Sequence, residues 1–220
     1  MEELREYRTI AEPCTIEQVI KKSKFYGRLY PAESMEQAQE ILDGLKKQFW
    51  DASHNCSAMI FGQMREFSRC SDDGEPQGTA GMPMLETLRG SGLTNILAVV
   101  TRYFGGTLLG TGGLVRAYGS SVSLALQAAR KICYKPRVVF SLELPFRLWG
   151  KAESQLLAAG YEIGEVQYTD AVSGTIFSDF GAEGRLAKIV SEISAGKAAP
   201  VEIERRYQVI EEREASWPGK

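Results

Sequence analysis

The sequence has few of the residues on which metal sites and covalent cross-links depend. It contains one histidine and four cysteines in 220 residues, and the cysteines lie far apart with no Cys-x-x-Cys spacing. These counts argue against a structural zinc site and against a disulfide framework. The cysteines are therefore expected to be reduced thiols.

Long apolar runs are also missing. Residues 96–100 form one of the longest, far short of the roughly 18 residues that a membrane span needs. The acidic, charged start of the chain does not resemble a secretory signal. We therefore expect a cytoplasmic protein that makes no contact with a membrane.

The chain has no large excess of charge of either sign. Its formal net charge is -2, which argues against nucleic-acid binding by bulk charge. The residues before Pro136 carry 16 basic and 15 acidic side chains, whereas the remainder carries 10 basic and 13 acidic ones. A contact with RNA is therefore expected from the first part of the chain.

Glycine, in contrast, is abundant in one segment. Residues 74–119 hold 11 of the 22 glycines, with dense bursts at residues 74–81 and 105–113. Glycine is needed where φ is positive or where another group comes close, so both bursts predict shaped loops. The second burst leads directly into an apolar helical pattern, and the amides at a helix N-terminus favour anions.

This second loop is a candidate site for a phosphate or a nucleic acid, although it lacks the Gly-Lys-Ser/Thr ending of a P-loop. Backbone amides would donate hydrogen bonds and two arginines would supply positive charge. The candidate residues are Arg102, Thr107, Gly110, Thr111, Gly112, Gly113 and Arg116. Alternatively, the glycines only allow a strand, a loop and a helix to pack closely, and the pattern does not decide between the two.

Three carboxylates, Asp72, Asp73 and Glu75, lie within four residues. Such a group suits Mg²⁺ or general acid–base chemistry. Asp-Asp-Gly-Glu-Pro is also a typical turn sequence, because aspartate side chains bond to nearby backbone amides. The turn is the favoured interpretation.

His54 and Cys56 would share one face of a strand, which would allow a thiol nucleophile and its base. No orienting group is apparent beyond Asn55 and Asp51, so both residues are expected to be structural. Tyr103, Phe104 and Tyr118 could stack on the bases of single-stranded RNA, but aromatic residues next to a buried strand favour a core position.

Hydrophobic periodicity predicts two domains of mixed α and β structure. Residues 1–135 are expected to hold strands at 7–10, 14–21, 25–31, 56–61 and 96–101, and helices at 34–49, 83–88 and 113–131. The boundary is placed at residues 135–137, because a helix should end before Pro136. Residues 136–210 then read β-α-β-β-α-β, the ferredoxin-like order, with strands at 138–144, 161–168, 173–178 and 201–209. Residues 211–220 are expected to be a frayed tail.

Several motifs resemble those of a known family. They are His54-Asn55-Cys56, Ser71-Asp72-Asp73-Gly74-Glu75-Pro76, Gly78-Thr79-Ala80-Gly81, Thr94-Asn95, and the long motif at residues 100–118. Together they are similar to the YigZ branch of the IMPACT family. The resemblance covers nearly the whole chain, and motifs of this length are specific.

The resemblance implies an α+β protein of two domains. The N-terminal domain would have the fold of the second domain of the fifth small-subunit ribosomal protein, and the C-terminal domain would be ferredoxin-like and similar to the last domain of elongation factor G. The superfamily of the first fold includes ribosomal proteins, translation GTPases and small-molecule kinases. Nucleic-acid binding and phosphate handling therefore both stay open.

Eukaryotic relatives regulate translation initiation by competing for a scaffold that activates a starvation-responsive kinase. The additional N-terminal domain that they use for this is not in the present sequence, so that partner is not expected here. The family brings no accepted set of catalytic residues, and the sequence does not indicate an oligomeric state.

We expect a non-enzymatic regulator of translation, associated with RNA or the ribosome and binding through the face around the two glycine loops. No cofactor is expected. The alternative is a metal-dependent enzyme that uses a phosphate ester or a nucleotide. In that case the protein would bind phosphate or Mg²⁺, and Asp72, Asp73 or Glu75 would handle the metal or a proton.

Overall fold

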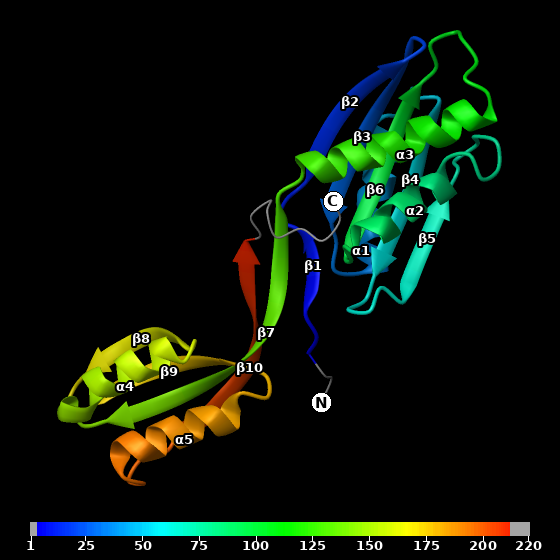
Figure 1. Ribbon diagram of the computed structural model, residues 1–220. Coiled ribbons are helices and arrows are strands. Elements are labelled where there is room, and N and C mark those ends of the chain that lie inside the picture. Colours follow the sequence, from blue (N-terminus) through cyan, green and yellow to red (C-terminus); the bar gives the residue numbers. More distant parts are fainter. Residues whose placement is uncertain (1–3, 212–220) are drawn as a thin grey trace. The chain divides into compact units, whose positions relative to one another are not determined.

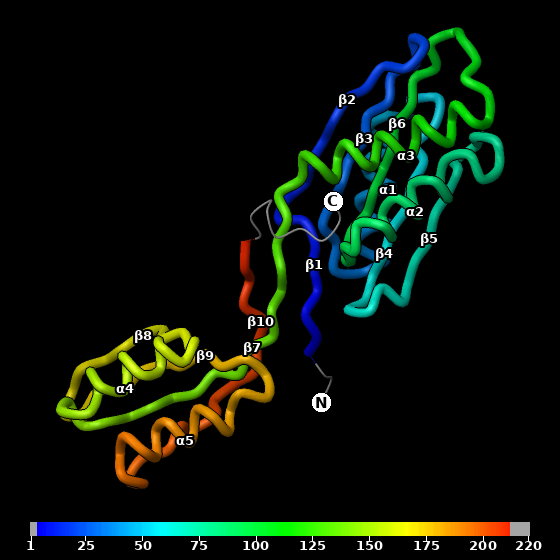
Figure 2. Tube along the Cα trace, viewed as in Figure 1, coloured from blue at the N-terminus to red at the C-terminus, as the bar shows by residue number. Residues whose placement is uncertain are grey.

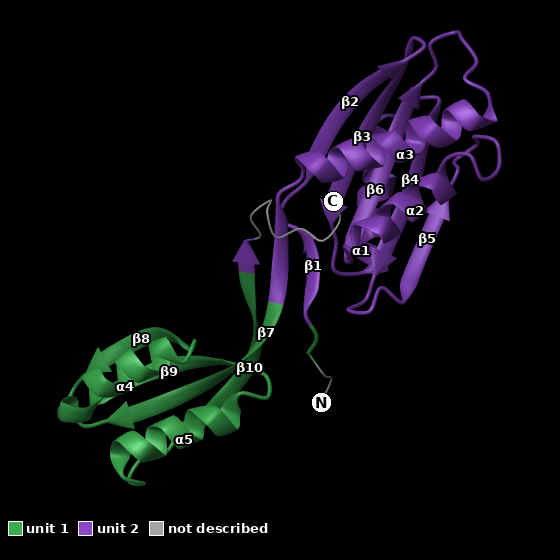
Figure 3. Cartoon of the chain, in the orientation of Figure 1, with its two compact units in different colours: residues 1–5, 135–209 green, residues 6–134, 210–220 purple. Residues whose placement is uncertain are grey.

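The computed structural model describes residues 4–211. It divides into two compact units (Figure 3). We call residues 6–134 the first unit, which is purple and labelled unit 2 in the figure, and residues 135–209 the second unit, which is green and labelled unit 1. Residues 4–5 group with the second unit, and residues 210–211 group with the first. Each unit has its own hydrophobic core.

The first unit is built on a five-stranded antiparallel sheet in the order β2-β3-β6-β4-β5 (Figure 1). The strands are β2 (Cys14–Ile20), β3 (Ser23–Pro31), β4 (His54–Phe61), β5 (Phe67–Ser71) and β6 (Ile96–Tyr103). The central strands β4 and β6 are buried on both faces, which explains why β6 reads as a continuous apolar run.

Helices cover both faces of this sheet. α1 (Met35–Gln48) packs on one face through Ala38, Leu42 and Leu45, and the Ser34 side chain caps its N-terminus as expected. α2 (Gly81–Ser91) and α3 (Thr111–Ala128) pack on the other face, over the larger core of the unit. The element order therefore gives three layers, with helices on either side of the sheet.

The elements of the second unit follow in the order β7 (Lys131–Leu144), α4 (Phe146–Ala158), β8 (Glu162–Tyr168), β9 (Val172–Asp179), α5 (Glu183–Ser194) and β10 (Val201–Glu211). The first four residues of β7 and the last two of β10 group with the first unit. The sheet follows the order β10-β7-β9-β8, and β7 also pairs with β1 (Tyr7–Ile10). Both helices contribute to a single core, so they cover the same face of the sheet. None of the helices in residues 4–211 is both long and apolar enough to cross a membrane.

Two features differ from the expectations. The edge strand β5 was not predicted, because its mostly exposed sequence has no alternating apolar pattern. The expected helix end at residue 131 was also wrong, since α3 ends at Ala128 and β7 runs continuously through Pro136.

Pro136 is tolerated inside β7 because of where the pairing changes. β1 pairs with residues 131–134 of β7, and β9 pairs with residues 137–144. Pro136 falls between these stretches, so the ladders with β1 and β9 do not require its missing N–H. Of the expected tail, Glu211 ends β10 and residues 212–220 lie outside the described residues.

Candidate functional site

Four loops of the first unit lie at one end of its sheet, which we call the loop end (Figure 1, Figure 2). They are residues 21–22, 49–53, 72–80 and 104–110. Strand register fixes this arrangement, since Lys24 lies opposite Tyr103 and His54 lies opposite Arg102. The two glycine-rich loops therefore share one end of the sheet.

Glu75 is the centre of a buried polar cluster at the loop end. The residue is only 7% exposed, and its Oε1 accepts hydrogen bonds from Arg102 Nη1 at 2.6 Å and from the Tyr118 hydroxyl at 2.7 Å. Its Oε2 lies 3.8 Å from His54 Nε2. Because a buried carboxylate is costly without donors, these contacts fix the first glycine loop against β4, β6 and α3.

Arg102 is equally buried, at 5% exposure. Its guanidinium pairs with Glu75, and it lies 5.4 Å from the centroid of the Phe25 ring. The geometry therefore gives no support to Arg102 as a charge partner for a phosphate, because its charge is paired with Glu75 inside the fold. Its Nε has no hydrogen-bond partner within residues 4–211.

Asp72 organises the first glycine loop and the start of α2. Its carboxylate accepts hydrogen bonds from the backbone N–H groups of Gly78, Ala80 and Gly81, at 2.8, 3.0 and 2.8 Å. Burial alone would raise the pKa of Asp72, but the amides of Gly78, Gly81 and Ala80 outweigh it and hold the pKa below its ordinary value. Asp72 thus caps α2 from a distance of eight to nine residues in the sequence.

Asp73 joins the same loop to α1 and β4. Its carboxylate accepts hydrogen bonds from Lys46 Nζ and from the backbone N–H of Asn55. Its φ of 45° lies in the left-handed region, which aspartate tolerates better than most residues. This agrees with the interpretation of the segment as a turn.

Each of the three carboxylates thus accepts hydrogen bonds from a different set of donors within the protein. Residues 4–211 contain no group of three or more His, Cys, Asp or Glu side chains that could hold a metal ion. The geometry therefore gives no support to a shared metal or general-base role for Asp72, Asp73 and Glu75.

His54 and Cys56 both lie in β4, but they do not form a nucleophile and base pair. His54 Nδ1 lies 2.9 Å from the carbonyl oxygen of Asp73, a contact in which the ring nitrogen must be the donor. The Cys56 thiol donates to the carbonyl oxygen of Asp72 at 3.0 Å. Burial raises the pKa of Cys56 to about 12, and a hydrogen bond with Tyr118 only partly opposes this. The thiol therefore stays protonated.

The second glycine loop rests on the β2–β3 turn. A Cβ atom on Gly105 would lie 2.0 Å from the carbonyl carbon of Lys22, so only glycine fits there. The Gly105 N–H donates to Ser23 Oγ at 3.1 Å. Lys21, Lys22 and Lys24 are exposed, and none has an acidic partner in the described part of the chain. The close-packing interpretation thus holds for Gly105, which also brings three lysines beside the loop.

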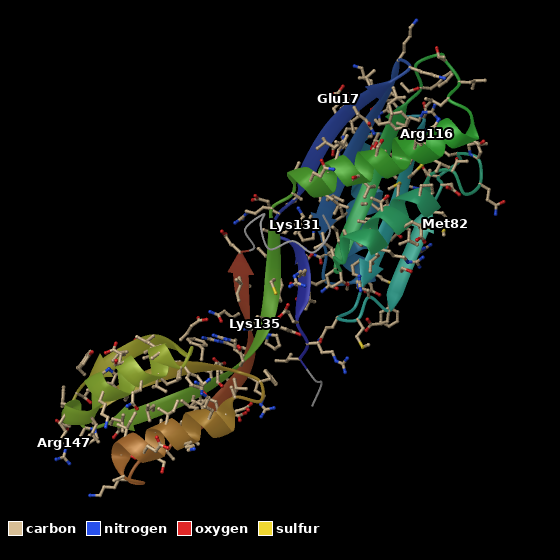
Figure 4. The ribbon with its side chains drawn as sticks, in the orientation of Figure 1. Glu17, Met82, Arg116, Lys131, Lys135 and Arg147 are labelled. Atoms are coloured by element: carbon tan, nitrogen blue, oxygen red, sulfur yellow. The ribbon has the colours of Figure 1, made fainter. Side chains whose placement is uncertain are left out.

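The N-terminus of α3 is open. The helix follows Gly110, whose φ is 74°, and it has no side-chain cap. The N–H of Leu114 donates to the carbonyl oxygen of Gly110 and so completes the first turn. The N–H groups of Thr111, Gly112 and Gly113 make no such hydrogen bond within the helix, as is normal for a first turn. Thr107 and Arg116 are both exposed, and Figure 4 labels Arg116 on α3.

Aromatic residues of the loop end fall into two groups. Tyr118 is fully buried and its ring meets Phe25 edge to face, so it cannot stack on a base. Phe104 is exposed and Tyr103 is half-buried. The favoured expectation of a core position is therefore right for Tyr118 alone.

Sequence reasoning missed Ser23 and Lys46, and it did not foresee that the backbone N–H of Asn55 binds Asp73; these three residues hold the loops together. Their partners lie 18 to 82 residues away in the chain, so no local pattern pointed to them. The three lysines of the β2–β3 turn, in contrast, form a visible basic cluster in the sequence that could have been noticed.

Known proteins resemble this chain over most of its length. The Impact N-terminal domain matches residues 21–126, which include the loop end. The chain is 37% identical over 204 residues to the IMPACT family member YvyE of Bacillus subtilis (strain 168), covering 93% of this chain and 94% of that protein. It is 38% identical over 161 residues to the IMPACT family member YigZ of Escherichia coli (strain K12), covering 69% and 79%. A solved structure, described as the crystal structure of a hypothetical protein, is 32% identical with a TM-score of 0.58 and covers 92% of this chain and 99% of its own. These matches confirm the resemblance drawn from the motifs, and the chain belongs to the IMPACT family.

Proposed function

We propose that the protein is a cytoplasmic regulator of translation that binds RNA, alone or within the ribosome, through its glycine-loop face. This face consists of Lys21, Lys22, Lys24, the loop of residues 104–110 and the first turn of α3. Membership of the IMPACT family supports the link to translation, because the eukaryotic members act there. The chemistry of the loop end supports RNA as the ligand.

The observation that carries the proposal is the contact between Gly105 and Lys22. It seats the second glycine loop on the β2–β3 turn, where Lys21 and Lys22 of the turn and Lys24 at the start of β3 are exposed. The loop then leads to the open amides of α3 and to the exposed Arg116. Lysines and helix N-termini are common phosphate ligands in nucleic-acid-binding proteins.

We assign the first unit to the ribosomal-protein-like fold and the second unit to the ferredoxin-like fold that resembles the last domain of elongation factor G. The sheet order β10-β7-β9-β8, with both helices on one face, supports the second assignment. A fold does not determine a function, so the proposed function rests on the site and not on these fold assignments.

The proposal is tested with a labelled single-stranded RNA whose binding is followed by fluorescence anisotropy at several salt concentrations. Replacing Lys21 and Lys22 together by alanine is expected to weaken binding. Each lost phosphate contact should lower the slope of log K against log salt by about 0.7, because fewer counterions are released from a single strand.

A matched control is the double variant Lys188→Ala and Lys197→Ala, which removes two exposed lysines from the second unit. It should leave both affinity and slope unchanged. An equal loss in the two double variants would mean that binding depends on total charge rather than on the glycine-loop face, and a wild-type protein that binds neither RNA nor ribosomes would refute the proposal.

The enzyme alternative requires carboxylates that are free to act. Asp72, Asp73 and Glu75 instead accept hydrogen bonds from backbone amides, Lys46, Arg102 and Tyr118. The contacts therefore favour a binding protein. A phosphatase and nucleotidase screen with and without Mg²⁺ addresses the alternative directly, since turnover that is lost in Asp72→Asn would revive it.

A further inference from the structure

α1 covers only half of its face of the first unit's sheet. The core beneath it is formed by Leu97 and Val99 of β6 together with residues of β4, and no β2 residue belongs to it. On the same face, Thr15, Glu17 and Val19 of β2 are exposed. We call the uncovered part, over β2, β3 and the end of β6, the open half-face.

Aromatic side chains are concentrated on the open half-face. β3 alternates so that Phe25 and Leu29 enter the core on the α3 side, while Tyr26 and Tyr30 lie on the opposite side. Tyr26 meets Tyr103 of β6 edge to face, with the ring centroids 6.1 Å apart. Both tyrosines are only half-buried, so their rings form part of the surface.

A buried cation lies among these rings. Arg28 is 7% exposed, and its guanidinium carbon lies 4.1 Å from the centroid of the Phe49 ring and 5.4 Å from that of Tyr26. Its Nη1 donates to Thr101 Oγ1 at 2.8 Å, and no carboxylate forms an ion pair with it in residues 4–211. The open half-face therefore has a positive charge in its floor that the fold does not neutralise.

An exposed tryptophan borders this surface. Trp50 is 82% exposed. It lies between Phe49, which contacts Arg28, and Asp51, whose Oδ1 accepts a hydrogen bond from the Tyr103 hydroxyl at 3.0 Å. A tryptophan in such a position adds nothing to the core, but it is a suitable surface for stacking.

The charges around the open half-face are complementary to a polyanion. Lys24 lies opposite Tyr103 in the β3–β6 register, and Lys21 and Lys22 follow at the adjacent turn. Glu17, which lies opposite Tyr26, is the acidic residue facing this surface from β2. Asp51 accepts a hydrogen bond from the neutral Tyr103 hydroxyl and keeps its negative charge. The balance is still positive, because the four cations Lys21, Lys22, Lys24 and Arg28 outnumber the two carboxylates Glu17 and Asp51.

We infer that the open half-face binds single-stranded RNA by stacking bases on Tyr26, Tyr103 and Trp50, with the phosphates near Lys24 and the β2–β3 turn. The inference rests on the proposed function and names its ligand more closely. A duplex hides the faces of its bases, whereas a single strand can lay unstacked bases on aromatic side chains of a sheet. RNA recognition by stacking tolerates many sequences, because every base has an aromatic face.

The test compares a fluorescein-labelled oligouridylate with a labelled RNA duplex, using the full chain. Tyr26→Leu and Trp50→Ala are each expected to weaken binding of oligouridylate by roughly 5- to 150-fold, the effect of losing one stacked base. Binding of the duplex should change little. The control is Phe67→Ala, which removes an exposed aromatic residue from β5 in the same unit.

A spectroscopic measurement separates stacking from a general loss of structure. In a Trp217→Phe background, Trp50 and the buried Trp149 are the remaining indoles. Oligouridylate should quench the emission of this variant, and the further change Trp50→Phe should abolish the quenching.

The outcomes distinguish this inference from the proposed function. Suppose that Lys21→Ala with Lys22→Ala weakens RNA binding, but Tyr26→Leu and Trp50→Ala bind like wild type and oligouridylate does not quench Trp50 in the Trp217→Phe background. The proposed function then stands and the stacking surface is refuted. Equal losses for duplex and oligouridylate in the aromatic variants would also overturn it. A wild-type chain that binds no RNA would refute both the proposed function and the stacking surface.

Discussion

Glu75 and Arg102 both lie in the sequence motifs, and their charged side chains stabilise the fold. Their side chains are 3% and 6% exposed and form an ion pair inside the first unit. Removing one partner of a buried pair leaves an uncompensated charge, and this costs about 3–5 kcal/mol. We therefore expect Glu75→Ala to lower the free energy of unfolding by about that amount, measured by urea denaturation followed by circular dichroism.

Two comparisons test this reason. The double variant Glu75→Leu with Arg102→Met removes both charges and should recover much of the loss. Glu86→Ala breaks an exposed pair with Arg89 and should change the free energy by about 0–1 kcal/mol. If Glu75→Ala costs no more than Glu86→Ala, the cluster is not a stabilising centre of the loop end.

The lowered pKa of Asp72 predicts how the free energy of unfolding depends on pH. Its pKa is lowered in the folded state from an ordinary value of 3.8, so its contribution to stability is fully present above that value and is lost as the pH falls through the folded pKa. Wild type and Asp72→Asn should differ in free energy of unfolding by a constant amount between about pH 5 and 7. The difference should shrink below the ordinary value of 3.8.

Asp170→Asn, in an exposed turn of the second unit, serves as the control for this titration. Urea denaturation at each pH measures all three proteins. A difference between wild type and Asp72→Asn that stays the same down to about pH 2 would show that the three amide contacts do not depend on the ionised carboxylate.

At the scale of the elements, two glycines of the second loop have opposite roles. A Cβ on Gly105 would lie 2.0 Å from Lys22, whereas a Cβ on Gly112 would meet nothing within 4 Å. Gly105→Ala should therefore displace the loop from the β2–β3 turn and weaken RNA binding. Gly112→Ala should leave stability unchanged or raise it slightly, because alanine restricts the unfolded chain.

Thermal unfolding and the anisotropy titration measure this pair of variants together. Both carry the same added methyl group, so a difference between them reports on position rather than on chemistry. Equal RNA affinity of Gly105→Ala and wild type would mean that the seating of the loop on the lysines is not needed for binding.

The elements that local pattern determines were predictable. α1 combines a serine cap with helical spacing of apolar residues, and β6 is a continuous apolar run. β5 has neither signal, since its stability comes from pairing with β4 rather than from its own side chains. The sequence pattern therefore could not predict this strand.

The candidate site was only partly predictable. The sequence located the motif residues, but the partner of Arg102 lies 27 residues away, and only the fold decides that this arginine is buried. The open half-face was missed because it depends on which strands α1 leaves uncovered. No local pattern contains that information.

At the scale of the whole molecule, the residue at which the second unit begins decides whether a fragment of that unit can fold alone. The core of the second unit draws on α4, α5 and the sheet strands between residues 138 and 176, without any residue of the first unit. Arg137 lies outside this hydrophobic core but belongs to the same unit, since it is buried and its guanidinium pairs with Asp179 and Glu162. A fragment that keeps these pairs must begin no later than residue 137, and the second unit itself begins at Lys135.

A fragment of residues 135–211 should accordingly fold by itself and unfold cooperatively, because it contains the complete core. A fragment that starts at Val138 should also fold, but with a free energy of unfolding lower by about 1–3 kcal/mol through the loss of charged hydrogen bonds. The loss stays moderate because Asp179 and Glu162 are each 52% exposed and can bind water instead. Urea denaturation and the dispersion of amide proton shifts measure both fragments. A molten fragment of residues 135–211 would mean that the second unit requires the first, and equal stability of the two fragments would mean that Arg137 contributes nothing to the stability of this unit.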